Sequence, residues 1–401
     1  MKALLLLLLF LFGLTCANDE LILVFDLSRH GARAPLVEQY SQDFDVNVGM
    51  LSASGMRQHY LIGRYLRKKY IEQMEFLSPQ YKEDEIHVTS THLGRTIQSA
   101  RCHLIGLYPP ESSNNQIQGD FEKSMPLMNL SDDYVGNTRY SIPSKYEPIA
   151  VHNNEQKRDT VYSLGSCPYL YSKMNARREN PSAWKKFDAY FKPRIYKKIA
   201  EYFGLPEQEL NYQSTYVLGD ALVSLEFEGL FSRENFTEEE WLDVKRLQIP
   251  WLIDSVSPLG NKLMVSKLFN PILEFMLMKM GRDHDNRQLT GFRGTEKYIY
   301  FSTHDTMIAN FLRFFNPENF ELEYVDYASG FIFELYKRPN GEYYVKIFYN
   351  NSQIKLHECK NIDCEFDQFY RMFREHGLFQ DEVFYICNSG IITPPEFRDS
   401  I

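Results

Sequence analysis

The chain has 401 residues with a formal net charge of −9, and 44% of its residues are hydrophobic. This length allows a large buried core and two or three domains. The hydrophobic content is that of an ordinary globular protein. The negative net charge argues against a nucleic-acid-binding protein, which would need a basic face. Any anionic ligand would therefore have to be bound by a local cluster of cations.

The N-terminal segment, residues 1–17, is predicted to be a cleaved signal peptide. Lys2 supplies a positive start, residues 3–14 form an apolar run, and small residues follow at the expected cleavage position. The run is shorter than the roughly 20 residues of a membrane-spanning helix. We therefore expect a mature chain that begins near Asn18 and resides outside the cell or in the lysosomal lumen.

The first part of the mature chain alternates between strand and helix patterns. The apolar run at residues 21–25 predicts a strand over 21–27, and a helical pattern follows at 54–70. A second strand is predicted at 86–88, followed by a helix over 93–105. Pro109 and its neighbour are expected to end that helix. This alternation favours an α/β sheet domain.

The middle of the chain, residues 121–293, contains few clean strand patterns. Helices are predicted at 183–202, 237–247 and 259–280, with Thr237 as an N-cap residue. We interpret this region as a mainly helical cap inserted into the sheet domain.

Strand patterns return after the predicted cap. One strand is expected at 298–302, and a hairpin is expected from strands at 330–336 and 343–349 around residues 339–341. The predicted fold class is α/β, with a central, mostly parallel sheet flanked by helices. The sheet domain is expected to comprise residues 18–120 and 294–401.

Charged and polar side chains follow three of the predicted strands. Arg29 and His30 follow the first strand, Arg95 follows the second, and His304 and Asp305 follow the third. Ligand sites in open α/β sheets lie beyond the carboxyl ends of strands. We therefore expect these side chains to meet in one crevice.

These residue types together suit phosphoryl transfer. An imidazole such as His30 can act as a nucleophile through one nitrogen while the other donates to a backbone carbonyl. Asp305 can protonate the leaving oxygen and then activate water. Fixed guanidinium groups can replace a metal ion as the charge clamp, so no cofactor or metal is expected. The predicted phosphate-binding residues are Arg29, Arg33, Arg95 and His304.

Six further histidines are interpreted as surface residues or hydrogen-bonded core residues: His59, His87, His92, His103, His152 and His357. No quartet of histidines and cysteines has the spacing of a zinc site, which disfavours such a site.

Five cysteines remain after the predicted signal peptide. In an oxidising compartment most of them should pair. Cys359 and Cys364 are close enough for a local disulfide, and Cys167 could pair with Cys387. Cys102 is then left over and is interpreted as a small buried hydrophobic residue. N-glycosylation sequons occur at Asn129, Asn235 and Asn350.

Residues 29–35 resemble the Arg-His-Gly-x-Arg-x-Pro signature of the histidine acid phosphatases. Residues 55–70, 87–110 and 302–306 resemble further segments of that family, particularly of its prostatic and lysosomal members. The resemblance implies a sheet domain with a helical cap and a two-step phosphomonoesterase reaction through a phosphohistidine. It makes His30 the nucleophile, Asp305 the proton donor and the three arginines with His304 the phosphate-binding residues. It also matches Cys167 and the Cys359/Cys364 pair to cysteines of the family, and it is compatible with a homodimer.

The chain departs from this family's pattern near Arg95. Thr89 stands where many relatives have arginine, and His92 and Gly94 stand where they have aspartate. We expect these changes to alter the rim of the pocket more than its chemistry. No C-terminal anchor segment is recognised, which favours a chain without a membrane anchor.

The expected function is an acid phosphatase acting on small phosphate monoesters, with no nucleic-acid partner. A phytase, or a phosphatase specific for a lipid or a nucleotide, would use the same catalytic residues. Phytate would require extra cations at the edge of the cap, for which Lys185-Lys186 and Lys197-Lys198 are candidates. A non-catalytic phosphate-binding protein is disfavoured because His30 and Asp305 are both present.

Overall fold

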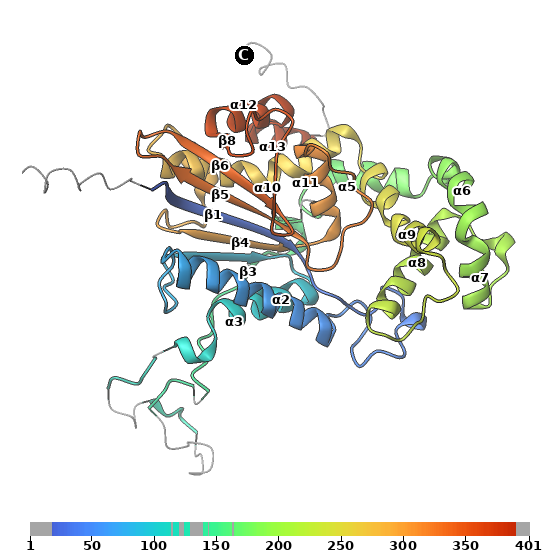
Figure 1. Ribbon diagram of the computed structural model, residues 1–401, viewed down its shortest axis with the longest axis horizontal. Coiled ribbons are helices and arrows are strands. Elements are labelled where there is room, and N and C mark those ends of the chain that lie inside the picture. Colours follow the sequence, from blue (N-terminus) through green and yellow to red (C-terminus); the bar gives the residue numbers. More distant parts are fainter. Residues whose placement is uncertain are drawn as a thin grey trace, which may run out of the picture.

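In the computed structural model, the described residues are 18–113, 115–119, 124–128, 139–142, 144–162 and 164–389. They form one eight-stranded sheet with helices on both faces and a group of helices beyond one end (Figure 1). The predicted signal peptide and Asn129 lie outside the described residues.

The sheet has the strand order β3-β2-β4-β1-β5-β6-β7, with β8 paired to β6. The strands from β3 to β1 are mutually parallel, and the pairs from β1–β5 onward are antiparallel. The predicted α/β class, with mostly parallel central strands, is confirmed. The strands are β1 (Glu20–Arg29), β2 (Ile86–Ser90), β3 (His152–Asn153), β4 (Tyr298–Thr303), β5 (Gly330–Lys337), β6 (Tyr343–Tyr349), β7 (Ser352–Ile354) and β8 (Cys364–Glu365).

The parallel register aligns the carboxyl ends of the three predicted site strands. Ser302 of β4 pairs with Ser28 of β1 on one side and with Ser90 of β2 on the other. The residues that follow these strands therefore emerge at the same edge of the sheet. In Figure 1 this edge faces the separate group of helices.

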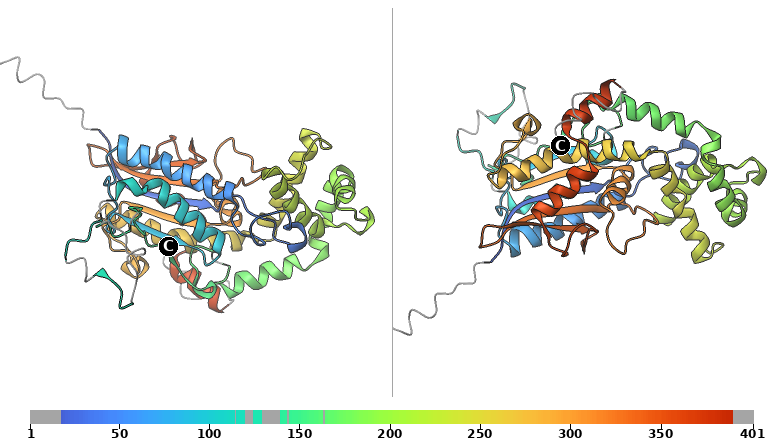
Figure 2. Two further views of the ribbon diagram at one scale, coloured as in Figure 1. Left: turned by 90° about the horizontal axis from the view of Figure 1, so that it is seen from below. Right: turned by 90° about the horizontal axis from the view of Figure 1, so that it is seen from above.

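Helices cover both faces of the sheet (Figure 2). β1 contributes side chains to the cores on both faces, because Phe25 belongs to one buried core and Val24 to the other. One face is covered by α2 (Ala53–Leu66) and α3 (Gly94–Leu107). The other is covered by α10 (Pro258–Lys279), α11 (Asp305–Phe315), α12 (Phe366–His376) and α13 (Gln380–Ser389).

The helices beyond the sheet form a cap with a core of its own. Trp184, Tyr212 and Trp241 are buried there. Thr237 is the N-cap of α9, as predicted, and forms a reciprocal capping box with Glu240. The cap helices are α6 (Lys185–Phe191), α7 (Lys197–Phe203), α8 (Tyr212–Phe227) and α9 (Glu238–Arg246), and α5 (Pro168–Arg178) leads into them.

The expected cap range of 121–293 also contains α10, which packs against the sheet. The ring centroid of Phe269 in α10 lies 5.8 Å from that of Phe25 in β1. The range therefore covers both the cap helices and a helix of the sheet domain. The shorter helices are η1 (Glu38–Tyr40), η2 (Arg67–Gln73), η3 (Pro110–Ser112), η5 (Gln156–Arg158), η6 (Pro181–Ala183), η7 (Lys192–Tyr196), η8 (Glu207–Glu209), η9 (Pro250–Asp254) and η10 (Asn286–Leu289).

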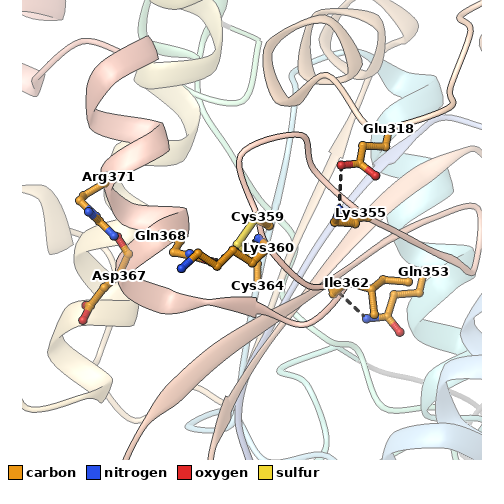
Figure 3. The surroundings of a disulfide bond; sticks show 10 residues. All are labelled: Glu318, Gln353, Lys355, Cys359, Lys360, Ile362, Cys364, Asp367, Gln368 and Arg371. Atoms are coloured by element: carbon orange, nitrogen blue, oxygen red, sulfur yellow. Dashed lines mark hydrogen bonds and ion pairs between the residues drawn. A yellow bond between two sulfur atoms is a disulfide. The ribbon is translucent and has the colours of Figure 1, made fainter.

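Both expected disulfides are present. Cys167–Cys387 joins the start of α5 to α13. Cys359–Cys364 closes a short loop before α12, near the Lys355–Glu318 ion pair (Figure 3). Cys102 has a free thiol and is half-buried on α3, so it is less enclosed than expected.

Two of the sequon asparagines, Asn235 and Asn350, are exposed. Within the described part of the chain, no helix combines the length and the apolar character needed to cross a bilayer.

The carboxyl of Asp26 in β1 gives the fold a pH-dependent stability. Burial raises the pKa of Asp26 to about 7, although a hydrogen bond from Tyr298 opposes the rise. The folded state therefore binds the Asp26 proton more tightly than the unfolded state does. The stabilisation that this proton gives the folded state is complete below about pH 4 and is lost as the pH rises through 7. We expect the wild type to lose up to about 4 kcal/mol more stability than Asp26→Asn between pH 4 and pH 8. Denaturant titrations of both proteins at both pH values measure this difference, and equal losses would contradict it.

Candidate active site

Residues from three strand ends meet at the edge of the sheet that faces the cap. The centroids of the imidazole rings of His30 and His304 lie 5.5 Å apart. Nη2 of Arg29 lies 3.0 Å from Oδ2 of Asp305. A hydrogen bond of 3.0 Å joins Nε2 of His304 to Oγ1 of Thr91, just beyond β2. The predicted convergence of the strand ends is therefore present.

The backbone around His30 is held from several sides. The amide of His30 donates to the carbonyl of Thr303, and His59 on α2 donates from Nε2 to the carbonyl of Arg29 at 3.0 Å. A Cβ on Gly31 would lie 2.4 Å from the carbonyl oxygen of Gly55, so glycine is required where α2 meets this loop. His59 is thus a core histidine, as expected, and it also fixes the backbone of the predicted site.

The imidazole of His30 has a defined orientation. Its Nδ1 lies 2.8 Å from the carbonyl oxygen of Gly31, and because a carbonyl can only accept, Nδ1 carries the proton. Nε2 then bears the free lone pair. Burial lowers the pKa of His30 well below its usual value, and Arg95, Arg29 and other nearby cations lower it further. The ring therefore stays neutral in acid.

Two arginines of the signature have acidic partners. Arg29 is fully buried, and its guanidinium lies 4.3 Å from the ring centroid of Tyr327 in addition to its contact with Asp305. Arg33 forms a bidentate pair with Asp220 on cap helix α8, at 2.8 and 3.1 Å. These contacts fix both guanidinium groups before any ligand binds.

Arg95, in the first turn of α3, differs from these two arginines. Burial, reinforced by the charge of Arg33, lowers the pKa of Arg95 to about 10. Its buried Nε has no hydrogen-bond partner, and within the described part of the chain no ion pair neutralises it. Arg95 is therefore a cation available to an anionic ligand.

Asp305 lies at the first position of α11, with its side chain 17% exposed to the cavity. Burial raises the pKa of Asp305, but Arg29, Arg33 and His304 outweigh burial, so the net effect is a lowered pKa. Without a bound anion, Asp305 is therefore a carboxylate paired with Arg29.

The predicted site residues surround a cavity of about 200 Å³. His30, Arg33, Arg95, His304 and Asp305 line it, whereas Arg29 lies behind this surface. Arg178, Tyr216 and Trp251 also line it, and the Arg178 guanidinium and the Tyr216 ring both stack on Trp251. Among the described residues, no group of three His, Cys, Asp or Glu side chains is placed to hold a metal ion.

The sequence as a whole matches a known family. The model of the histidine phosphatase superfamily, branch 2, matches residues 20–350. The chain belongs to this family. It is similar to prostatic acid phosphatase of Bos taurus, with 29% identity over 352 residues that cover 83% of this chain and 78% of the relative. It is also 25% identical to human lysosomal acid phosphatase over 340 residues, which cover 82% and 70% of the two chains.

The fold of this histidine phosphatase is also that of solved bacterial enzymes. The phytase of Hafnia alvei in complex with tartrate aligns with a TM-score of 0.65 and 16% identity, covering 90% of this chain and 98% of that one. At this identity the match shows the shared fold. Together with the acid phosphatase relatives, the family assignment makes this chain a phosphomonoesterase.

The residues that depart from the family pattern do not line the cavity, although Gly94 lies between two residues that do. Thr89 is buried, with its hydroxyl 2.8 Å from Nε2 of His87, and neither it nor His92 nor Gly94 lines the cavity. Leu93 lines the rim at this position instead. The proposed phytate-binding lysines are also absent from the cavity lining, and three of them are in ion pairs: Lys186, Lys197 and Lys198.

The sequence did not identify Asp220 as part of this phosphatase site. Replacing Asp220 with asparagine keeps one acceptor for Arg33 but leaves the buried guanidinium without a counter-charge. We expect the Tm to fall and KM for an aryl phosphate to rise about tenfold, because Arg33 loses its fixed orientation. Saturating inorganic phosphate should restore part of the lost Tm, since it supplies the missing negative charge. A Tm and a KM equal to those of the wild type would exclude this role for Asp220.

Proposed function

We propose that this phosphatase hydrolyses small phosphate monoesters through a phosphohistidine intermediate on His30. The observation that carries the proposal is the orientation of the imidazole, since the Gly31 carbonyl holds the proton on Nδ1 and leaves Nε2 free. The low pKa of His30, which burial causes first and the surrounding cations reinforce, keeps this lone pair available in acid. The neutral ring can therefore attack phosphorus at the pH of an acid phosphatase.

The guanidinium groups supply the charge clamp in this proposal. The three arginines come from the ends of two strands: Arg33 and Arg95 line the cavity, and Arg29 lies behind its surface. Planar guanidinium groups match phosphate oxygens. Arg95 is free to pair with the substrate, and His304 lies beside the nucleophile. These fixed cations would stabilise the equatorial oxygens of the transferring group without a metal ion.

Asp305 is the proposed proton donor in the first step. Its pKa is low without a ligand because Arg29 and other cations outweigh burial. A bound phosphate anion would offset those cations, so the carboxyl could take up a proton as the substrate binds. Nε2 of His30 then forms a bond to phosphorus as the ester P–O bond breaks, and Asp305 gives its proton to the leaving oxygen.

In the second step the phosphohistidine is hydrolysed. The Asp305 carboxylate takes a proton from water, the water oxygen attacks phosphorus, and the P–N bond breaks. Its electrons return to Nε2 of His30, which restores the neutral ring. Inorganic phosphate leaves, and the site is ready for another cycle.

The substrates are proposed to be small. The cavity of about 200 Å³ is narrow, and Tyr216 and Trp251 offer aromatic surfaces to an apolar alcohol group. A phytase is not favoured, because the lysines considered for phytate lie outside the cavity lining.

We also propose that the enzyme acts in the lysosomal lumen or outside the cell. The signal-like segment at residues 1–17 and the two disulfides support this location. Amino-terminal sequencing of the purified protein should begin near Asn18. Light scattering after size exclusion tests whether the enzyme is a homodimer, as the resemblance allows.

The activity test is hydrolysis of an aryl phosphate between about pH 3 and 9 with a metal chelator present. The proposal expects maximal turnover in acid and no effect of the chelator. Loss of activity on chelation, restored by a divalent cation, would contradict the metal-free clamp. A rate maximum above neutral pH would contradict acid catalysis by Asp305.

A further inference from the structure

A second cavity lies between helix α2 and the central strands β1 and β5 of the sheet. Its volume is about 460 Å³, more than twice that of the catalytic cavity. Asp26, Ser28 and Gly330 line it from the strands, and Asn350 and Asn351 line it from the turn after β6. The two cavities share no lining residue. The second cavity is therefore distinct from the catalytic cavity, although Tyr327, whose ring packs against Arg29, lines it.

The strand side of this cavity carries a buried acid. Asp26 is 3% exposed, and Oδ2 accepts a hydrogen bond of 2.7 Å from the hydroxyl of Tyr298. Nε2 of His103 is 3.8 Å from the same oxygen, too far for a hydrogen bond. Within the described part of the chain, Asp26 forms no ion pair with lysine or arginine. The buried Asp26 carboxyl therefore lacks a cationic partner, which a buried charge normally has.

The helix side of the cavity is mostly apolar, with Gln58 as its polar member. Leu61, Ile62 and Leu66 of α2 line it, and Ile332 of β5 faces them. Leu61 is 48% exposed and Tyr65 is 43% exposed, which are large fractions for apolar side chains at the opening of a cavity. This wall is therefore accessible to the apolar part of a ligand.

We propose that this cavity binds a small amphipathic amine. The ammonium group pairs with Asp26, and the apolar body lies against Leu61, Ile62 and Ile332. The cavity volume is within the range of small-molecule sites, which combine mostly apolar walls with few polar groups. The amine supplies the cation that the protein itself does not place beside the carboxyl.

The titratable groups around Asp26 predict how binding depends on pH. Tyr298 and Tyr300 face it from β4, Tyr70 from η2 and His103 from α3. A second carboxylate, that of exposed Asp326 in the loop before β5, also lines the cavity. Burial lowers the pKa of His103 well below its usual value, so this ring adds no charge in the neutral range. Because burial raises the pKa of Asp26 to about 7, amine binding should strengthen as the pH rises from 5 to 8.

The binding test uses 2-phenylethylamine and its neutral analogue 2-phenylethanol on the full-length mature protein. Calorimetry is performed with saturating inorganic phosphate, so that the catalytic cavity is occupied. We expect the amine to bind at least about tenfold more tightly than the alcohol at pH 8. Asp26→Asn should remove this difference and leave the affinity for the alcohol unchanged, whereas Asp326→Asn, which removes the other carboxylate of the lining, should keep it.

A second variant tests the apolar wall of the cavity and leaves Asp26 unchanged. Leu61→Trp adds bulk at an exposed position and should weaken binding of both compounds. Equal affinities for amine and alcohol, unchanged amine binding in Asp26→Asn, or displacement of the amine by phosphate would each overturn the proposal. Absence of binding up to about 10 mM would also overturn it.

Discussion

Replacing His30 with alanine is expected to lower kcat for an aryl phosphate by at least about 10⁴-fold, since removing a covalent nucleophile leaves only binding and charge stabilisation. The Gly31 carbonyl and the three arginines would remain in place, so phosphate binding should be retained. Steady-state kinetics and phosphate binding by calorimetry measure the two effects separately.

The matched control for this variant is His357→Ala, because His357 is exposed and does not line the catalytic cavity. Its kcat should equal that of the wild type. If His30→Ala retained a tenth or more of wild-type turnover, the imidazole could not be the nucleophile.

Asp305→Asn is expected to produce the second-largest loss. Asparagine cannot donate a proton to the leaving oxygen, so kcat for an alkyl phosphate should fall by about 10²- to 10⁴-fold. A nitrophenyl phosphate has a weakly basic leaving group and should lose much less in the first step. Slow attack by water on the phosphoenzyme should then give a burst of nitrophenol in stopped-flow measurements.

Asp84→Asn is a suitable control, because Asp84 is exposed and outside the catalytic cavity. An equal loss for alkyl and nitrophenyl phosphates, without a burst, would show that Asp305 neither donates the proton nor activates water. Arg29 loses its counter-charge in Asp305→Asn, so the kinetics should be measured well below the Tm of the variant.

The strand-end residues of the site could be predicted from the sequence because each belongs to a local pattern. Arg29 and His30 come within a few residues of the end of an apolar run, and so do His304 and Asp305. A parallel sheet then brings the ends of such strands together, as the pairing of Ser28 with Ser302 shows. The family signature added the roles of these residues.

The contribution of the cap could not be predicted in the same way. Asp220 meets Arg33 across 187 residues of chain, and no local pattern encodes that distance. One signal was present, because Asp220 is the lone acid within the apolar stretch 217–225 of its helix. A buried acid on an apolar helix needs a partner, and Arg33 supplies it.

The extent of the cap was difficult to predict for a related reason. α10 is buried along most of its length, so its hydrophobic pattern does not reveal which layer it covers. Tyr327, whose ring packs against the Arg29 guanidinium, was missed because it lies in the loop between α11 and β5. Both features depend on tertiary packing.

The covalent intermediate at His30 is the central step of the proposed reaction. Rapid quenching during turnover, followed by mass spectrometry under alkaline conditions that preserve phosphohistidine, tests it most directly. The account predicts one acid-labile phosphate on the peptide containing residues 29–33, more abundant in Asp305→Asn and absent from His30→Ala. A turning-over enzyme that carries its phosphate on another residue, or that forms no phosphoenzyme even in Asp305→Asn, would contradict it.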